Sequence, residues 1–177
     1  DSNLELQTQA LVPIPPYIRG GISDLEDERD YQTCFAKVEG ALAAPTAALH
    51  FTPALLEVLT KKGVQINYLT LHVGASSFQA VYKDDQIVAP GSESFFYDPE
   101  LLKEITKAKT EGRKVIAVGT TTTRALESMA RLPERAAGWI DTSLFIKPGF
   151  EFKLVDSLIT NFHQPGTTHM FLVEAFM

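Results

Sequence analysis

The sequence predicts an α/β protein, with helices packed on a mostly parallel or mixed β-sheet. Two observations carry this prediction: a helical pattern of apolar residues alternates with a β-rich stretch in residues 53–73, and the alternation repeats in residues 99–118. The composition agrees, because 45% of the 177 residues are hydrophobic and 21% are charged, which excludes a disordered chain. No apolar run reaches the roughly 18 residues that a membrane span needs.

Three helices have clear boundary signals. The first is predicted over residues 53–62, between a Thr-Pro start and a closing glycine. The second opens at an Asp-Pro pair and covers residues 99–111, again before a glycine. The third runs from about residue 122 to residue 132 and ends before a proline. In each of them apolar residues recur at helical spacing, which indicates one buried face.

Strands are predicted for five β-rich or apolar segments, namely residues 64–73, 78–82, 114–118, 144–146 and 154–160. Three prolines and two glycines in residues 13–23 predict an extended connector, and the charged residues 24–30 predict a solvated turn or short helix. We therefore divide the chain into a connector over residues 1–23 and an α/β body over residues 24–177. Because the chain starts at an aspartate and stops inside an apolar run, we expect it to be a piece of a larger protein.

Charge and cysteine content exclude several functional classes. Sixteen basic and twenty-two acidic residues give a net charge of −6, which argues against a generic nucleic-acid binder, although a local basic patch can still bind phosphates. The single cysteine, Cys34, excludes an internal disulfide framework and a multi-cysteine metal site, so we expect a reducing, cytoplasmic compartment. The sequence also lacks the GxSxG, GxGxxG, HExxH and P-loop patterns.

A strand-to-helix junction over residues 114–128 (KVIAVGTTTTRALES) is the first place where chemistry is expected. Four threonines follow Gly119, and this geometry directs free backbone N–H groups toward the carboxyl end of the sheet, where they can bind a carboxylate or a phosphate. The alternative is a threonine-capped helix on which Arg124 and Glu127 form an ordinary surface pair.

Three further segments combine histidine with strand ends or small residues. In residues 69–78 (LTLHVGASSF), His72 lies near the carboxyl end of a strand, either as a core residue or as a site residue. In residues 40–51 (GALAAPTAALHF), small side chains allow the close approach of a ligand or of another backbone. In residues 159–170 (ITNFHQPGTTHM), polar groups follow a strand, but the spacing of His163 and His169 does not suit a zinc site.

Taken together, these segments resemble the S-adenosylmethionine:tRNA ribosyltransferase-isomerase family of queuosine biosynthesis. The resemblance rests on PIPPYIR, YQTCFA, GALAAPTAALHF, LTLHVGASSF, VIAVGTTTTRALES and LITNFHQPGTT, which occur in the order of the family and span about residues 12–176. It implies a layered α/β body with a large mixed sheet flanked by helices. We therefore expect this sequence to be the family's α/β body without its inserted β-barrel domain and flanking parts.

The resemblance also implies a reaction. Members of the family transfer and isomerise the ribosyl group of S-adenosylmethionine onto a 7-aminomethyl-7-deazaguanine at the tRNA wobble position, which gives epoxyqueuosine and releases adenine and methionine. S-adenosylmethionine is the substrate, and the reaction uses no metal and no redox cofactor. The partners are thus S-adenosylmethionine and tRNA, with no membrane, and we expect a cytoplasmic monomer.

The family's functional positions carry over residue by residue. The resemblance implies that the catalytic residues are His50, His72, Glu93 and His163. It implies that the substrate-binding residues are Tyr31, Gln32, Pro45, Thr46, Thr70, Gly119, Thr120, Thr121, Arg124, Glu127 and Asn161. As hypotheses, His72 or His50 serves as general base or acid, Arg124 binds an anion, and Asn161 and His163 contact a base or ribose.

One departure from the family pattern leaves alternatives open. The family has a histidine shortly before the Ser-Glu pair that matches Ser92-Glu93, and Pro90-Gly91 stands there instead. The chain is therefore an active member, a divergent member with altered or no activity, or a module that binds S-adenosylmethionine or tRNA without catalysis. If the chain is an active member, we expect His50, His72, Arg124 and His163 to converge at one rim of the fold.

Overall fold

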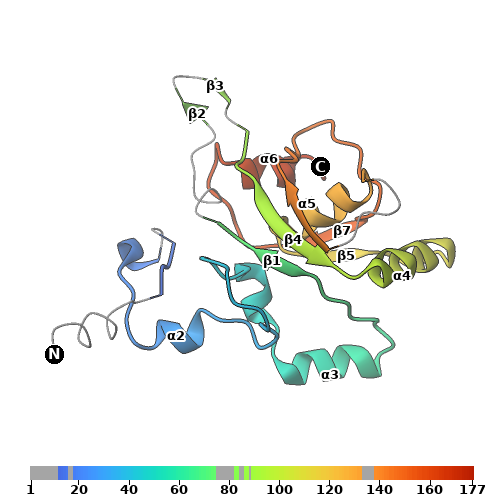
Figure 1. Ribbon diagram of the computed structural model, residues 1–177, viewed down its shortest axis with the longest axis horizontal. Helices are drawn as coiled ribbons and strands as arrows, with labels where there is room; N and C mark the ends of the chain where they lie inside the picture. The colour runs from blue at the N-terminus through green and yellow to red at the C-terminus, as the bar shows by residue number, and fades with distance from the viewer. Residues whose placement is uncertain (1–11, 16–17, 75–81, 84–85, 88, 133–137) are drawn as a thin grey trace.

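An antiparallel sheet of three strands forms one layer of the fold. The computed structural model describes residues 12–15, 18–74, 82–83, 86–87, 89–132 and 138–177. The sheet has the order β1 (Thr70–His72), β4 (Glu93–Tyr97) and β6 (Gly138–Thr142), and β4 lies in the middle. Strands β1 and β4 lie side by side in Figure 1. His72 is paired with Ser94, and Phe95 is paired with Ile140. Burial alternates along β4, so one face of the sheet packs on the protein interior and the other does not.

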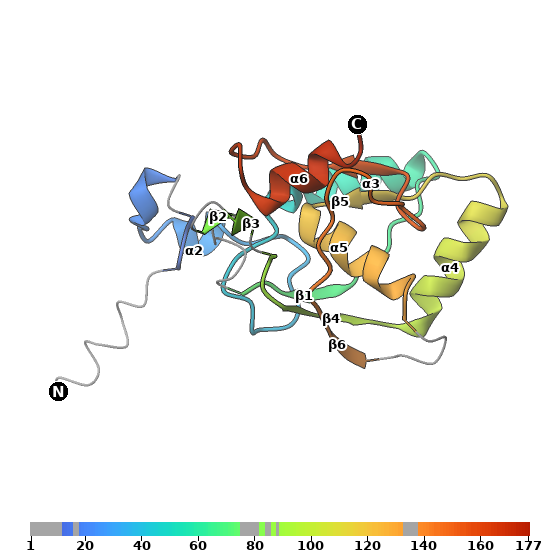
Figure 2. The same cartoon turned by 90° about the horizontal axis from the view of Figure 1, so that it is seen from above.

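A parallel pair of strands lies on the other side of the core. β5 (Ile116–Val118) pairs with β7 (Ser157–Ile159), with Ala117 opposite Leu158. Helix α5 (Thr120–Met129) follows β5 directly and lies between this pair and the antiparallel sheet (Figure 2). Because it is covered on several sides, α5 buries eight of its ten residues, including polar ones.

The hydrophobic core connects these layers with helix α4 (Pro99–Thr110). Phe95 and Tyr97 of β4 pack with Leu101 and Ile105 of α4, and Met129 of α5 belongs to the same cluster. Asp98 caps α4 by accepting a hydrogen bond from the backbone N–H of Glu100, and proline occupies the first turn. The local signals that predicted this helix are therefore the ones that start it.

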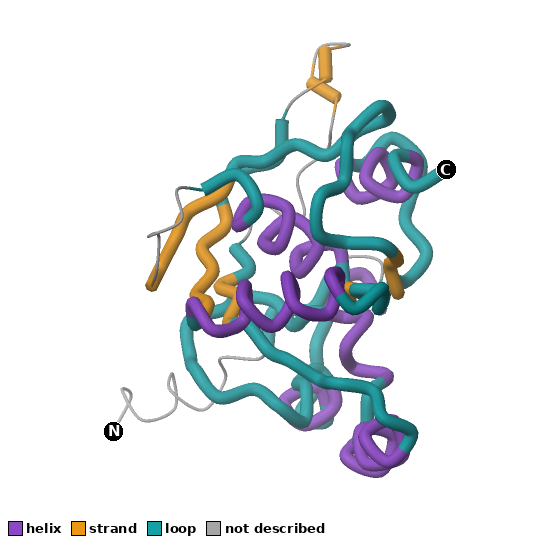
Figure 3. Tube along the Cα trace, turned by 90° about the vertical axis from the view of Figure 1, so that its right-hand side faces the viewer, coloured by secondary structure: helices purple, strands orange, loops and turns teal. Residues whose placement is uncertain are grey.

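The remaining elements surround this core. Helix α3 (Pro53–Lys61) buries none of its residues, and Figure 3 shows it end-on at the bottom, away from the strands. The short elements are η1 (Arg19–Gly21), α2 (Asp27–Asp30), η2 (Thr46–His50), the β2–β3 hairpin (Tyr82–Lys83 and Gln86–Ile87) and α6 (Thr168–Glu174). None of the helices in the described part of the chain is long and apolar enough to cross a membrane.

The predicted α/β class is confirmed, and so are its helices. The first two predicted helices match α3 and α4 to within a residue at each end, and the third begins two residues earlier than predicted, at Thr120. The described strands divide between three small sheets, one of them parallel. The division of the chain at residue 23 stays a prediction.

The strand predictions need more correction. The segments 114–118 and 154–160 contain β5 and β7, but the predicted strand 64–73 is paired only over residues 70–72. Residues 144–146 do not form a strand, because the carbonyl of Leu144 accepts a hydrogen bond from a buried arginine side chain instead of a strand partner. Most of the predicted strand 78–82 lies outside the described residues. The patterns did not predict β4, β6 or α6.

Candidate functional site

The candidate site lies where the parallel strands β5 and β7 end. The backbone N–H of Gly119, after β5, donates to the carbonyl of Ile159, at the end of β7, over 2.9 Å. Gly119 has φ = 94°, a conformation that favours glycine, and it turns the chain from the strand into α5. Among the residues that the structure describes, no side chain caps this helix, so the first N–H groups of Thr120 and Thr121 remain available at the carboxyl edge of the strands.

Two predicted site residues from remote parts of the chain meet at this edge. His50 ends η2, and Asn161 follows β7 by two residues. The Nε2 atom of His50 lies 3.1 Å from Oδ1 of Asn161, across 111 residues of sequence. His50 is exposed and Asn161 is half-buried. The contact brings the GALAAPTAALHF and LITNFH segments together at one place.

His163 lies in the same loop as Asn161 and is held by two contacts. Its Nε2 atom is 2.9 Å from the hydroxyl of Thr160, and its ring stacks on that of His169, with 5.2 Å between ring centroids and 13° between planes. Burial lowers the pKa of His163. Burial, followed by the charges of His163 and Arg124, lowers the pKa of His169 to about 4. Both imidazoles are therefore neutral near pH 7 and can accept a proton.

Arg124, one turn into α5, is used inside the protein. Its guanidinium donates to the carboxylate of Glu93 over 2.6 Å, and the two side chains are only 10% and 4% exposed. It also donates to the carbonyls of Leu144 and Gly91. Burial lowers the pKa of Arg124, and the charge of Glu93 acts against that effect. In this structure the charge of Arg124 is paired with Glu93, and its expected role as an anion-binding group stays a prediction.

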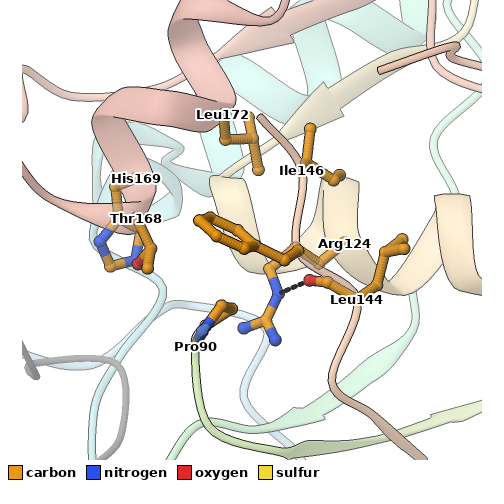
Figure 4. Close-up of a pocket in the computed structure, with 8 residues that line it drawn as sticks. Pro90, Arg124, Leu144, Ile146, Thr168, His169 and Leu172 are labelled. Atoms are coloured by element: carbon orange, nitrogen blue, oxygen red, sulfur yellow. Dashed lines mark hydrogen bonds between the residues drawn. The ribbon is translucent and has the colours of Figure 1, made fainter. Parts of the chain in front are cut away.

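A small pocket of about 10 Å³ borders this ion pair. Arg124, Leu144 and Ile146 form one side of it, and Thr168 and His169 of α6 approach from the other (Figure 4). This volume is enough for about one water molecule. It therefore does not accommodate a nucleoside, and the contacts of Arg124 and Glu93 describe a structural pair that joins α5 to β4.

Glu127, which was predicted to contact substrate, is also used internally. It is fully buried, and its carboxylate accepts hydrogen bonds from Arg131 and from three consecutive backbone N–H groups, those of Lys153, Leu154 and Val155. Burial raises the pKa of Glu127, but these hydrogen bonds outweigh that effect and the net pKa is lowered. Glu127 is thus a buried anion that holds the segment leading into β7, and its expected contact with substrate stays a prediction.

His72 faces away from the Arg124–Glu93 pair. It is paired with Ser94, so its side chain lies on the face of the sheet opposite to Glu93. There its ring contacts that of Trp139 in a tilted arrangement, with 4.1 Å between ring centroids. Gly40 packs on the other side, where a Cβ atom would come within 2.7 Å of the His72 ring. Among the described residues, the buried Nε2 atom of His72 has no hydrogen-bond partner.

A cavity of about 1070 Å³ collects most of the predicted substrate residues from the first half of the chain. Tyr31, Gln32, Pro45 and Thr70 line it, together with Val118 and Ile159 at the ends of the parallel strands and Thr122 in the first turn of α5. Its volume lies at the upper end of the range for small-molecule sites. Thr46 begins η2, four residues before His50.

The structure therefore brings together most, but not all, of the predicted site. His50, Asn161 and His163 share one edge, and the stacked His169 links them to the pocket beside Arg124. His72 lies on the face of the sheet opposite to Glu93, and its convergence with His50 and His163 stays a prediction. Sequence reasoning missed His169: its spacing from His163 across a Pro-Gly turn does not suit zinc but allows the ring stack that the structure shows. Within the described residues, no group of three or more His, Cys, Asp or Glu side chains could hold a metal ion.

Comparisons with known proteins show the family of this chain. A family model described as "Queuosine biosynthesis protein" matches residues 2–177. The S-adenosylmethionine:tRNA ribosyltransferase-isomerase of Thermotoga maritima is 48% identical over 165 residues, which are 93% of this chain and 48% of that protein. The enzymes of the same name from Thermus thermophilus and Herminiimonas arsenicoxydans are 48% and 46% identical, over 94% and 97% of this chain and 47% and 50% of those proteins.

A solved structure supports the fold as well. The crystal structure of S-adenosylmethionine tRNA ribosyltransferase from Thermotoga maritima matches with a TM-score of 0.57 and 42% identity, over 73% of this chain and 40% of that one. The chain spans about half the length of the curated relatives it matches. Because the family model covers nearly the whole sequence, the chain belongs to the queuosine biosynthesis protein family.

Proposed function

We propose that this chain is the α/β part of an enzyme that modifies tRNA with S-adenosylmethionine. The enzyme transfers and isomerises the ribosyl moiety of S-adenosylmethionine onto 7-aminomethyl-7-deazaguanine at the wobble position, and it releases adenine and methionine as epoxyqueuosine forms. The names of relatives that are 44–49% identical support this reaction. We further propose that the enzyme is a cytoplasmic monomer that needs no metal or organic cofactor.

The observation that carries the proposal is the meeting of His50 and Asn161. Each belongs to a different family motif, and their side chains are 3.1 Å apart at the carboxyl edge of β5 and β7. Ligands of α/β proteins bind at this edge of a parallel sheet. The large cavity opens beside the same strand ends, at Val118 and Ile159, and we assign it to the nucleoside part of S-adenosylmethionine.

Proton transfer is assigned to the histidines of this edge. The reaction needs a base that removes a proton from the carbon beside the sulfonium, and an acid that protonates the departing adenine. His163 is neutral near pH 7 because burial lowers its pKa, so it can accept the first proton. His50 is exposed beside Asn161 and can exchange a proton with the leaving base. The uncapped N–H groups of Thr120 and Thr121 suit the methionine carboxylate.

An assay of adenine release tests the proposal. Full-length protein is mixed with S-adenosylmethionine and tRNA that carries 7-aminomethyl-7-deazaguanine. We expect adenine and epoxyqueuosine to form together, and we expect His50→Ala to release adenine about 100-fold more slowly. His72→Ala is the informative second variant, because His72 was predicted to be catalytic but faces away from Glu93; a normal rate would remove it from the catalytic set.

Binding without catalysis is the competing function, and Pro90-Gly91 in place of the family's histidine favours it. Calorimetry with S-adenosylmethionine separates the two. Heat of binding together with adenine release supports the enzyme, whereas binding without adenine release from the full-length protein contradicts the proposed reaction.

A further inference from the structure

Phe162 has the largest exposed fraction of the exposed large hydrophobic residues that the structure describes, at 106%. The other phenylalanines in the described ranges are better covered; Phe96, the next most exposed, stands at 40%, and Phe152 and Phe176 stack on each other. A fully exposed aromatic ring gains nothing from burial in the fold. It therefore needs an explanation outside the packing of this chain, and its place in the candidate site supplies one.

The two neighbours of Phe162 turn into the protein and hold the ring outward. Asn161 on one side contacts His50 over 3.1 Å, and His163 on the other contacts Thr160 over 2.9 Å and stacks on His169. With both neighbouring side chains held by these contacts, the ring of Phe162 is left exposed to solvent. The ring is thus presented by a loop that is anchored on both sides.

Hydrogen-bonding groups lie directly beside the exposed ring. Asn161 uses its Oδ1 atom for His50, and the described part of the chain offers no hydrogen-bond partner to its Nδ2 amide group. An aromatic face next to a free amide is the combination by which proteins recognise unpaired nucleobases, through stacking on the ring and hydrogen bonding at the edge of the base. A purely apolar docking site would not need the amide.

We propose that Phe162 is a stacking platform for an unpaired base of the tRNA substrate. This inference rests on the proposed function, which supplies two candidate bases, one in the RNA and one in S-adenosylmethionine. Sites for small molecules enclose most of the ligand surface, whereas the described part of the chain leaves the ring of Phe162 fully exposed. Its exposure fits a base that arrives with a macromolecule, and so it assigns Phe162 to the RNA.

The test compares Phe162→Ala, Phe162→Leu and Phe162→Trp in the full-length protein. The probe is an anticodon stem-loop RNA with 7-aminomethyl-7-deazaguanine at the wobble position. Leucine keeps an apolar side chain without a π-face, whereas tryptophan keeps the face and reports stacking by fluorescence quenching. Leu25→Ala is the matched control, because Leu25 is 82% exposed and lies near α2, far from this loop in sequence.

We expect the alanine and leucine variants to bind the RNA about 5- to 150-fold more weakly than the wild type. The tryptophan variant should bind like the wild type, and its fluorescence should be quenched. The KM for S-adenosylmethionine should stay unchanged. Wild-type affinity in Phe162→Leu would overturn the inference in favour of apolar contact with protein. If the variants lost affinity for S-adenosylmethionine only, the inference would be overturned, because the ring would then stack on the adenine of that substrate. RNA binding is measured without turnover. A wild-type protein that releases no adenine would therefore contradict the proposed function without affecting the result on RNA binding.

Discussion

Polar side chains occur both along the buried helix α5 and at the edge of the sheet where α5 begins. The first group is buried and the second is accessible to solvent. Arg124 and Glu127 lie inside the protein, and their charges are met by Glu93, Arg131 and backbone groups. His50 and Asn161 lie at the edge of β5 and β7, where they contact each other but remain accessible. All of these residues fall in segments that resemble one family.

The difference separates polar groups that the fold uses from those that it leaves for a ligand. A buried charge without its partner costs several kcal/mol, so satisfied buried pairs are revealed by loss of stability when one member is removed. An accessible histidine or amide contributes little to folding and is revealed by loss of activity. The following variants test this separation, in order of their expected effect on the free energy of unfolding.

Glu127→Ala should have the largest effect. It leaves three backbone N–H groups and Arg131 without their acceptor in a fully buried place, so we expect a loss of about 5 kcal/mol in the free energy of unfolding. Glu127→Gln keeps an acceptor oxygen and should lose less. Urea unfolding measures both, with Glu100→Gln on the exposed face of α4 as a control near zero. A stable Glu127→Ala protein with impaired adenine release would place Glu127 at the edge site.

Arg124→Met should follow, with a loss of about 3 to 5 kcal/mol, because it leaves Glu93 buried without its counter-charge. The double variant Arg124→Met with Glu93→Leu removes both charges and should recover much of that loss. A double-mutant cycle in urea measures the coupling. Additive effects of the two single changes would show that the pair is not the structural unit described above.

The third test uses pH. The pKa of His169 is about 4 in the folded protein and about 6.5 when unfolded, so between these values the unfolded chain binds more protons. The stability that this group contributes is fully present above pH 6.5 and is lost as pH falls toward 4. Between pH 7 and pH 4, we expect the free energy of unfolding of His169→Leu to fall by about 3 kcal/mol less than that of the wild type. Parallel pH profiles of urea unfolding would contradict the burial of this imidazole, and agreement of the two proteins at pH 7 is the control.

His50→Ala and Asn161→Ala should have the smallest effect on folding, within about 1 kcal/mol, because both act at an accessible edge. Either change should slow adenine release by about 100-fold. Glu57→Ala on the exposed helix α3 is the control for both measurements. If either edge variant unfolded as readily as Glu127→Ala, the distinction between the two regions would be wrong.

Local signals account for what could be predicted of the fold. Helices α3 and α4 begin at a capping side chain followed by proline, and these contacts span only three residues, so sequence alone locates them. β4 and β6 escaped prediction because a short strand is selected by its partners, here β1 on one side of β4 and β6 on the other. The predicted strand over residues 144–146 fails for a similar reason, since a side chain from α5 takes the carbonyl of Leu144.

By itself, the sequence determined the family, the α/β class and the set of polar residues that could form a site, because motif order and capping are properties of neighbours along the chain. Only the tertiary structure decided how each residue is used. It joined His50 to Asn161 across 111 residues, neutralised Arg124 with Glu93, and placed His72 on the far face of the sheet. The physical reason is that the cost or availability of a polar group depends on its burial and partners, which long-range packing alone sets.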